Sequence, residues 1–83
     1  MKKYKGVIVN LHKHKNYGFI REQETGRNYF FHRGGSITDF DELVEGNEVE
    51  FMIIELESPS EHKHKAIGVT VREPIYTPPV GVY

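Results

Sequence analysis

Apolar and polar side chains alternate with a period of two in five stretches of the chain, and turn residues or charged residues separate these stretches. Such alternation is typical of β-strands that have one buried and one exposed face. In the first stretch, Val7, Val9 and Leu11 share one face. The fold class is therefore predicted to be all-β, with strands over residues 4–11, 17–22, 27–32, 48–56 and 65–72.

The segment between the third and fourth predicted strands, residues 33–45, lacks this alternation. Its Gly34-Gly35-Ser36 sequence predicts a flexible turn, and residues 38–41 resemble a helix-capping pattern that predicts one short helical turn. Five short antiparallel strands with one long connection after the third are typical of a small barrel. Closure of the barrel removes the exposed edges that would make a lone sheet aggregate.

The composition agrees with a single small β domain. Val and Ile together number 15 and Leu and Ala only four in the 83 residues, and side chains branched at Cβ suit a pleated sheet. The chain has no cysteine, so packing alone must stabilise the core. We predict one domain over residues 1–73, followed by a proline-rich tail over residues 74–83 that either is flexible or packs on the barrel or a partner.

Several classes of protein find little support in the sequence. The longest uninterrupted apolar run is four residues, Phe51 to Ile54, whereas a membrane helix needs roughly 20. The basic start of the chain leads into no long apolar stretch, so we expect no signal peptide, no membrane association and a cytoplasmic location. Without cysteine, a carboxylate pair or a phosphate-binding glycine loop, the chain is predicted to have neither enzymatic activity nor a cofactor.

Charge is distributed unevenly along the chain, although the formal net charge is only −1. Residues 1–38 carry a net charge of +6, and residues 39–57 contain eight acids and no base. This asymmetry favours a side that faces a polyanion and a side that faces solvent, but charges that simply cover strand edges would give the same totals. The placement of the aromatic residues must decide between these interpretations.

Flat rings recur at alternate positions of the second and third predicted strands. Tyr17 and Phe19 share one face of the second strand, and Phe30 and His32 share one face of the third. If the strands are neighbours, four rings lie on one surface, where each nucleic-acid base that stacks contributes roughly 1 to 3 kcal/mol in any sequence context. The flanking cations that complete the predicted binding surface are Lys13, Lys15 and Arg33.

These rings could instead fill the core. Tyr29, Phe31 and Phe51 have the opposite parity and are predicted to be core residues. Burial of Tyr17, Phe19 and Phe30 would require Gly18, Ile20, Tyr29 and Phe31 to face water. That arrangement exposes more apolar area, so exposed rings are favoured.

Two segments that contain these rings resemble motifs of a known family. Residues 15–20, KNYGFI, resemble the first ribonucleoprotein motif of cold-shock domains, residues 29–32, YFFH, resemble the second, and the resemblance extends over about residues 5–71. It implies a five-stranded antiparallel OB-type barrel that binds single-stranded RNA or DNA. By resemblance, Tyr17, Phe19, Phe30 and His32 stack on bases and Lys15 contacts a phosphate. Phe40 matches an aromatic residue that covers one base.

The chain departs from the family pattern at three positions. Asn10 stands where the family has a stacking tryptophan, Leu11 stands at the aromatic position that follows it, and Arg33 stands at the aromatic position after the motif histidine. At roughly 1 to 3 kcal/mol per base, three missing platforms weaken binding by several kcal/mol if nothing replaces them. Arg33 is expected to replace one in part, because a guanidinium plane stacks on bases and pairs with phosphate.

The tripeptide His-Lys-His occurs twice, at residues 12–14 and 62–64, in two predicted loops that border the binding face of an OB-type barrel. The imidazoles could bind a metal such as zinc, but structural zinc sites usually contain cysteine, so we predict no metal. Instead, Lys13, Lys63 and Lys65 are expected to flank the nucleic-acid path. The histidines would add positive charge in mild acid and strengthen binding there.

The sequence thus predicts a module that binds single-stranded RNA or DNA with little sequence specificity and acts as an RNA chaperone. The alternative is an OB-type module for protein interactions, in which the loss of rings at positions 10, 11 and 33 has eroded nucleic-acid binding. Monomer and dimer are both compatible with the sequence.

Overall fold

A computed structural model describes residues 2–56 and 64–72 of the chain. The predicted tail over residues 74–83, and Lys63 with the histidine before it, lie outside the described residues. The five strands lie within one residue of the predicted limits: β1 Tyr4–His12, β2 Tyr17–Glu22, β3 Asn28–His32, β4 Glu48–Glu55 and β5 His64–Val71. Within these described ranges, three single-turn 3-10 helices occupy links between the strands: η1 Lys13–Lys15, η2 Arg33–Gly35 and η3 Phe40–Glu42.

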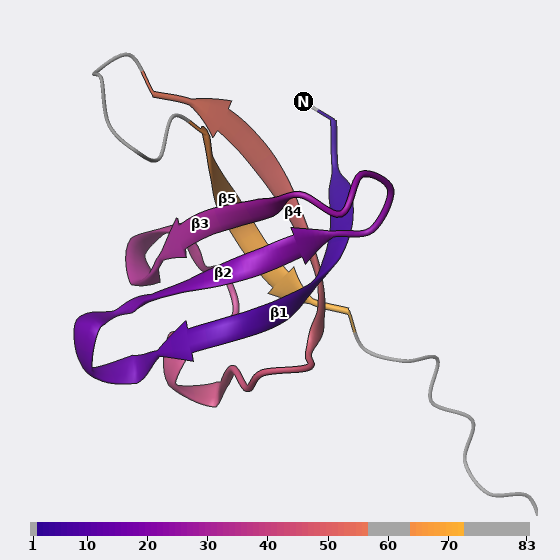
Figure 1. Ribbon diagram of the computed structural model, residues 1–83. Coiled ribbons are helices and arrows are strands. Elements are labelled where there is room, and N and C mark those ends of the chain that lie inside the picture. The colour runs from indigo at the N-terminus through magenta and orange to yellow at the C-terminus, as the bar shows by residue number, and fades with distance from the viewer. Residues whose placement is uncertain (1, 57–63, 73–83) are drawn as a thin grey trace, which may run out of the picture.

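The strands close into a barrel in the order β1-β2-β3-β5-β4. In Figure 1, β1, β2 and β3 lie side by side as one curved layer, and β4 and β5 complete the barrel behind them. The predicted all-β barrel is confirmed, but the pairing is not antiparallel throughout. β3 and β5 pair in parallel, with Phe30 opposite Lys65, because the long link carries the chain across the end of the barrel before β4.

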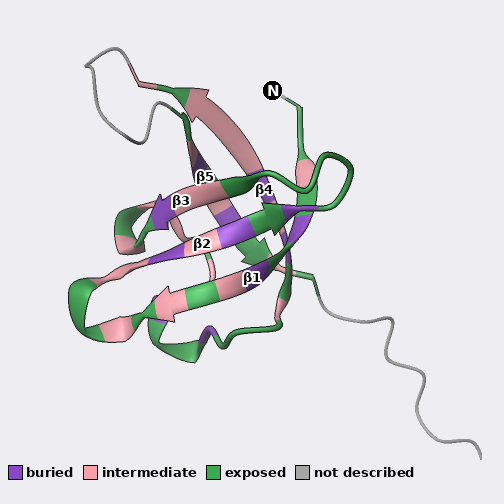
Figure 2. Cartoon of the chain, in the orientation of Figure 1, coloured by how far each residue is buried: buried purple, intermediate pink, exposed green. Residues whose placement is uncertain are grey.

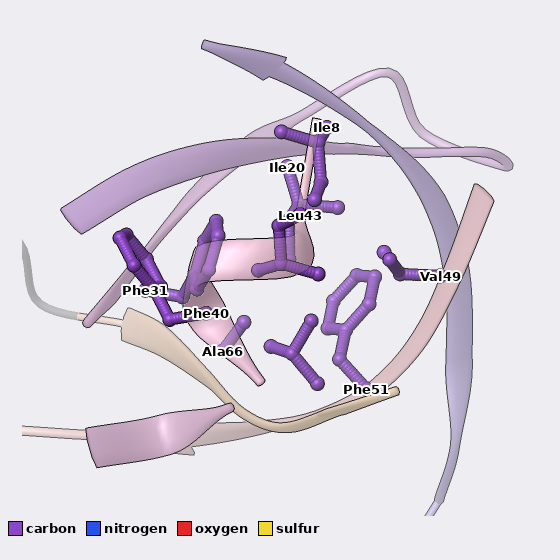
Figure 3. Packing of buried hydrophobic residues seen from close by; sticks show 9 residues of the cluster. Ile8, Ile20, Phe31, Phe40, Leu43, Val49, Phe51 and Ala66 are labelled. Atoms are coloured by element: carbon purple, nitrogen blue, oxygen red, sulfur yellow. The ribbon is translucent and has the colours of Figure 1, made fainter. Parts of the chain in front are cut away.

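The interior of the barrel is apolar and closely packed (Figure 3). Phe31 and Phe51 lie in it as predicted, and Tyr29 packs against its edge. The 33–45 link also contributes two core residues, Phe40 and Leu43. Together the buried apolar residues are Ile8, Ile20, Phe31, Phe40, Leu43, Val49, Phe51, Ala66 and Val69.

Two β-bulges change the face that a strand presents to the core. In β1, Ile8 lies opposite Ile20 and Asn10 lies opposite Phe19, so Val9 is an extra residue. Before it the even-numbered Ile8 faces inward, and after it the odd-numbered Leu11 packs against the core. The predicted shared face of Val7, Val9 and Leu11 is therefore wrong, since a bulge interrupts the alternation and leaves Val7 37% exposed.

The second bulge lies in β5, where Gly68 has a φ of +62°. Between the pairs Glu50–Thr70 and Met52–Ile67, β5 has one residue more than β4. The left-handed backbone suits glycine, which has no Cβ. In the 33–45 link, the predicted helical turn is confirmed as η3, whose Asp39 side chain accepts a hydrogen bond from the Asp41 backbone N–H at 3.0 Å.

Candidate functional site

The outer surface of β1, β2 and β3 carries two cross-strand rows of side chains. One row is His12, Tyr17 and His32, which are paired directly across the three strands. The other is Asn10, Phe19 and Phe30, and it continues to Lys65 on β5. We call the rings of His12, Tyr17, Phe19, Phe30 and His32 the aromatic face.

The rings of the aromatic face are half-buried or exposed, and all of them except His32 are within ring-contact distance of a neighbour in the face. The Tyr17 ring centroid lies 5.5 Å from that of Phe30 and 6.0 Å from that of Phe19, and the Phe19 and Phe30 centroids are 6.0 Å apart. Figure 2 shows buried and accessible positions alternating along β2. The structure thus brings together the four rings that the sequence predicted on one surface, and none of them belongs to the core.

Gly18 explains why the rings flanking it can share one surface. A Cβ atom at this position would lie 2.8 Å from Cε1 of Phe31 and 2.7 Å from the carbonyl oxygen of Asn10. Only glycine fits there without displacing its neighbours. The Phe31 ring therefore fills the space beneath β2, and Tyr17 and Phe19 remain on the outer side of the strand.

His12 adds to the aromatic face a ring that the alternation of the sequence does not predict there. Its imidazole lies 4.6 Å from the Tyr17 ring centroid, with 24° between the planes, so the two rings stack. The bulge at Val9 places it there, because regular alternation from Ile8 would have turned position 12 toward the core. No glycine marks this bulge in the sequence, so the position of His12 carried no local signal.

Arg33 borders the aromatic face and is held in three ways. Its Nε donates to Oδ1 of Asn16 at 2.9 Å, its Nη2 donates to Oδ1 of Asp41 at 2.7 Å, and its guanidinium lies 4.7 Å from the Phe40 ring centroid. The hydrogen bond and positive charge of Arg33 lower the pKa of the Asp41 carboxyl below its ordinary value of 3.8. The same hydrogen bond raises the pKa of Arg33, so both partners are charged at neutral pH.

Lys13 and Glu45 attach the long link to the same border. The Lys13 ammonium donates to the backbone oxygens of Asp41 at 2.7 Å and Phe40 at 3.1 Å. The Glu45 carboxylate accepts a hydrogen bond from the Leu11 backbone N–H at 3.0 Å. This border of the face therefore combines two predicted cations with acidic side chains of the link.

A model of the family described as the "'Cold-shock' DNA-binding domain" matches residues 4–72. The chain belongs to the cold-shock domain family. This is a family of nucleic-acid-binding OB-fold domains, and the match covers all five strands. The predicted family is confirmed, and the aromatic face lies on the strands that carry the two ribonucleoprotein-like motifs.

A solved structure titled "drosophila Unr CSD456" is similar to this cold-shock domain, with 27% sequence identity and a TM-score of 0.70. The similarity covers 93% of this chain and 29% of the Unr chain. The cold-shock domain thus spans under a third of that structure's length. Among curated proteins, no sequence matches the chain.

One residue predicted from the family resemblance lies elsewhere. Phe40 is only 2% exposed, and its ring centroid lies 5.9 Å from that of Phe31 in the core of this cold-shock domain. This burial does not agree with the predicted role of covering a base, because the link folds inward and the Arg33 guanidinium lies 4.7 Å from the ring centroid. Asn10 is exposed and provides no ring at the position of the family tryptophan.

The remaining predicted cations of the cold-shock domain lie in two places. Lys15 is exposed at the end of η1, next to the start of β2, and Lys65 lies beside Phe30 at the other border of the aromatic face. Over residues 2–56 and 64–72, no three potential ligands are grouped as a metal ion would require. Within the same ranges, no helix is long and apolar enough to cross a bilayer.

Proposed function

We propose that this cold-shock domain binds single-stranded RNA or DNA by stacking bases on Tyr17, Phe19, Phe30 and His32. The observation that carries the proposal is the pair of cross-strand rows, in which these rings occupy neighbouring outward positions of β2 and β3. The centroid separations of 5.5 and 6.0 Å among Tyr17, Phe19 and Phe30 make one continuous surface of these three rings. His12 extends this surface onto β1.

Base stacking supplies affinity with little sequence specificity, because every base has a π face. Lys15, Lys13 and Lys65 provide positive charge around the rings, where the phosphates of a bound strand must pass. Lys63, predicted at the same surface, lies outside the described residues. Binding should therefore weaken as salt concentration rises, since each phosphate contact releases counterions.

The same binding supports an RNA chaperone function. A stacked base cannot pair with another base, so the domain would bind the open form of an RNA and not its duplex form. Mass action then shifts the equilibrium toward the open form as protein concentration rises. This mechanism requires no nucleotide hydrolysis. A fluorescence-quenched RNA hairpin would open as protein is added, and an unchanged signal at saturating protein would refute chaperone activity.

Two substitutions at Phe30 test the stacking mechanism. Phe30→Tyr retains a flat ring, whereas Phe30→Leu retains apolar volume without a π face. In titrations of labelled oligothymidine and oligouridine, we expect Phe30→Tyr to bind like the wild type. Phe30→Leu should bind about five- to a hundredfold more weakly, the equivalent of about 1 to 3 kcal/mol. Equal affinities for both variants would exclude stacking on this ring.

The same titration separates the proposal from the alternative of a protein-interaction module. The alternative gains some support from Asn10, which provides no platform, and from Arg33, whose charge Asp41 compensates. A domain whose nucleic-acid binding is eroded would show no saturable binding of either oligonucleotide. Saturable binding that depends on the Phe30 ring would favour the nucleic-acid function.

A further inference from the structure

A groove of about 450 Å³ lies beside the aromatic face, between β5 and the 34–37 segment of the long link. Its lining includes His32, Ile37, Lys65 and Ile67. Ile37 is 72% exposed, although its backbone N–H donates to the Val69 carbonyl at 2.8 Å. The groove thus presents an ordered apolar side chain to solvent, together with an imidazole and an ammonium group.

The groove is continuous with the aromatic face. His32 ends one cross-strand row of the face, and Lys65 follows Phe30 in the other, so both residues belong to the face and to the groove lining. Nδ1 of His32 accepts a hydrogen bond from the Gly34 backbone N–H at 3.2 Å. In the neutral ring the proton is therefore on Nε2, which is available to donate to a ligand oxygen.

Charge distinguishes this groove from others on the described surface. Its lining contains Lys65 and His32 but no carboxylate. Three other grooves each include at least one glutamate among Glu22, Glu48 and Glu50. A phosphate in this groove would meet positive charge without a lining acid to repel it, so the charge favours a polyanion over an acidic peptide segment or a bare apolar partner.

The opposite border of the aromatic face is less suited to a continuing strand. Asn10 offers no ring there, and Asp41 already pairs with Arg33. The Glu45 carboxylate lies against the Leu11 backbone, so a phosphate crossing β1 would approach two carboxylates of the link. Toward β1 a strand stacked on Phe19 and Phe30 therefore meets carboxylates and cations that already have partners within the chain, whereas toward β5 it meets positive charge with no carboxylate beside it.

We propose that the groove is an additional nucleotide subsite, into which a single strand continues from the aromatic face across β3 toward β5. The base or sugar contacts Ile37 and Ile67, and the adjoining phosphate contacts Lys65 and Nε2 of His32. This inference rests on the proposed nucleic-acid function, because the groove receives the next nucleotide of the strand that stacks on Phe30.

A series of oligothymidines of increasing length tests the subsite, covering about 4 to about 9 nucleotides, within the range known for one OB fold. The variant is Ile37→Ser, which changes an exposed side chain and should not disturb the core. The matched control is Val44→Ser, because Val44 is also an exposed aliphatic residue of the link, 57% accessible, but is not part of the groove. Lys65→Gln tests the phosphate contact through the salt dependence of binding, and its control is Lys5→Gln, because Lys5 is an exposed lysine of β1 opposite Glu50 and is not part of the groove.

The wild type and Val44→Ser should gain affinity with each added nucleotide until the groove is filled. Ile37→Ser should match them on the shorter oligonucleotides and lose the last gain, so that it binds the longer ones roughly three- to tenfold more weakly. Lys65→Gln should reduce the slope of log affinity against log salt concentration by about 0.7, the value for one phosphate contact on a single strand, and Lys5→Gln should not.

Three results would overturn the subsite. If Ile37→Ser follows the wild type at every length, no nucleotide contacts the groove. If it loses affinity equally at all lengths, Ile37 acts on the aromatic face as a whole. If it changes only the self-association measured by sedimentation, the groove is a protein contact. Failure of the proposed function itself is distinguishable, because the wild type would then bind no oligothymidine of any length.

Discussion

Arg33 and Asp41 form an ion pair of 2.7 Å at the border of the aromatic face, above the buried ring of Phe40. The arginine thus occupies a position where the family has an aromatic platform, but its charge is already compensated within the chain. A phosphate that approached Arg33 would compete with the Asp41 carboxylate. The acidic link is therefore expected to limit the affinity of this border for nucleic acid.

Asp41→Asn should raise the affinity for oligothymidine, because it frees the positive charge of Arg33 for phosphate. We expect a gain of about two- to fivefold at low salt that diminishes as salt is added. Fluorescence titration at two salt concentrations measures it. Glu42→Gln removes the same formal charge from the neighbouring position and serves as the control. Equal gains from both substitutions would show that net charge, rather than release of Arg33, explains the effect.

His12→Ala should weaken binding by about fivefold or more, because the stacked His12 and Tyr17 rings would lose the outer platform. His14→Ala is the matched control, since it removes an exposed imidazole two residues away on η1. The comparison is made at neutral pH by titration with oligouridine. A similar loss in both variants would mean that imidazoles contribute to binding wherever they stand near η1, and that the stack on Tyr17 has no special role.

Phe40→Ala should unfold the barrel more readily, by about 3 to 5 kcal/mol in the free energy of unfolding, because it opens a cavity beside Phe31. Phe30→Ala, which truncates the same side chain on the accessible face, should cost clearly less stability while reducing oligonucleotide affinity. Chemical denaturation followed by circular dichroism measures both. If Phe40→Ala kept full stability and lost only binding, the ring would have to leave the core to meet a base.

Gly18→Ala should destabilise the barrel by about 1 to 3 kcal/mol, since its Cβ would press against the Phe31 ring and the Asn10 carbonyl. Gly34→Ala provides the comparison, because the nearest atom to its Cβ is Nδ1 of His32 at 3.7 Å, an ordinary contact. Denaturation midpoints in urea should separate the two variants. Equal midpoints would indicate that β2 and Phe31 can move apart at little cost.

Glu22 should make the free energy of unfolding of the domain decrease as the pH falls into the acidic range. Its carboxylate accepts hydrogen bonds from the Glu24 backbone N–H at 2.6 Å and from the Thr25 hydroxyl at 2.7 Å, and these lower its pKa below the ordinary 4.5, in that order of importance. Because the pKa is lower in the folded state, the stabilisation is complete above the ordinary pKa and is lost as pH falls through the folded value.

Glu22→Gln should therefore lower the thermal unfolding midpoint by several degrees at neutral pH and by less in acid. Unfolding curves of both proteins from pH 7 down to about pH 2 measure the difference, and the curves should converge where the wild-type carboxylate is protonated. Glu24→Gln, a change two residues away in the same turn, should leave the difference between neutral and acidic conditions as in the wild type. Parallel curves for Glu22→Gln and the wild type would contradict this origin of the acid sensitivity.

The sequence was sufficient to predict what depends on alternation within one strand. The limits of β2 agree with the structure, and Tyr17, Phe19, Phe30 and His32 lie together because period two places them on one side of neighbouring strands. The sequence was not sufficient where one extra residue changes which alternate positions of a strand face the core. The bulge at Val9 does this in β1: Val7 lies outside the core, and His12 lies on the aromatic face. A bulge of this kind has no periodic signature.

The conformation of the long link, residues 33–45, also could not be predicted from the alternation of apolar and polar residues. Phe40 lies in a segment without alternation, so the family resemblance was the basis for its predicted role, and the resemblance misplaced it. The ion pair between Arg33 and Asp41 joins two positions of that same link, and their proximity depends on how η2 and η3 fold onto the barrel. Neither contact follows from spacing along the chain.

The extra residue at Val9 gives β1 one residue more than its pairing with β2 requires. Without Val9, Asn10 would follow Ile8 directly in an unbroken zigzag, and the residues after it would keep their partners in β2 and their sides of the strand. A single-codon deletion at this position is therefore expected to preserve the aromatic face, whereas a deletion within β2, which has no extra residue, would reverse the sides of the residues that follow it.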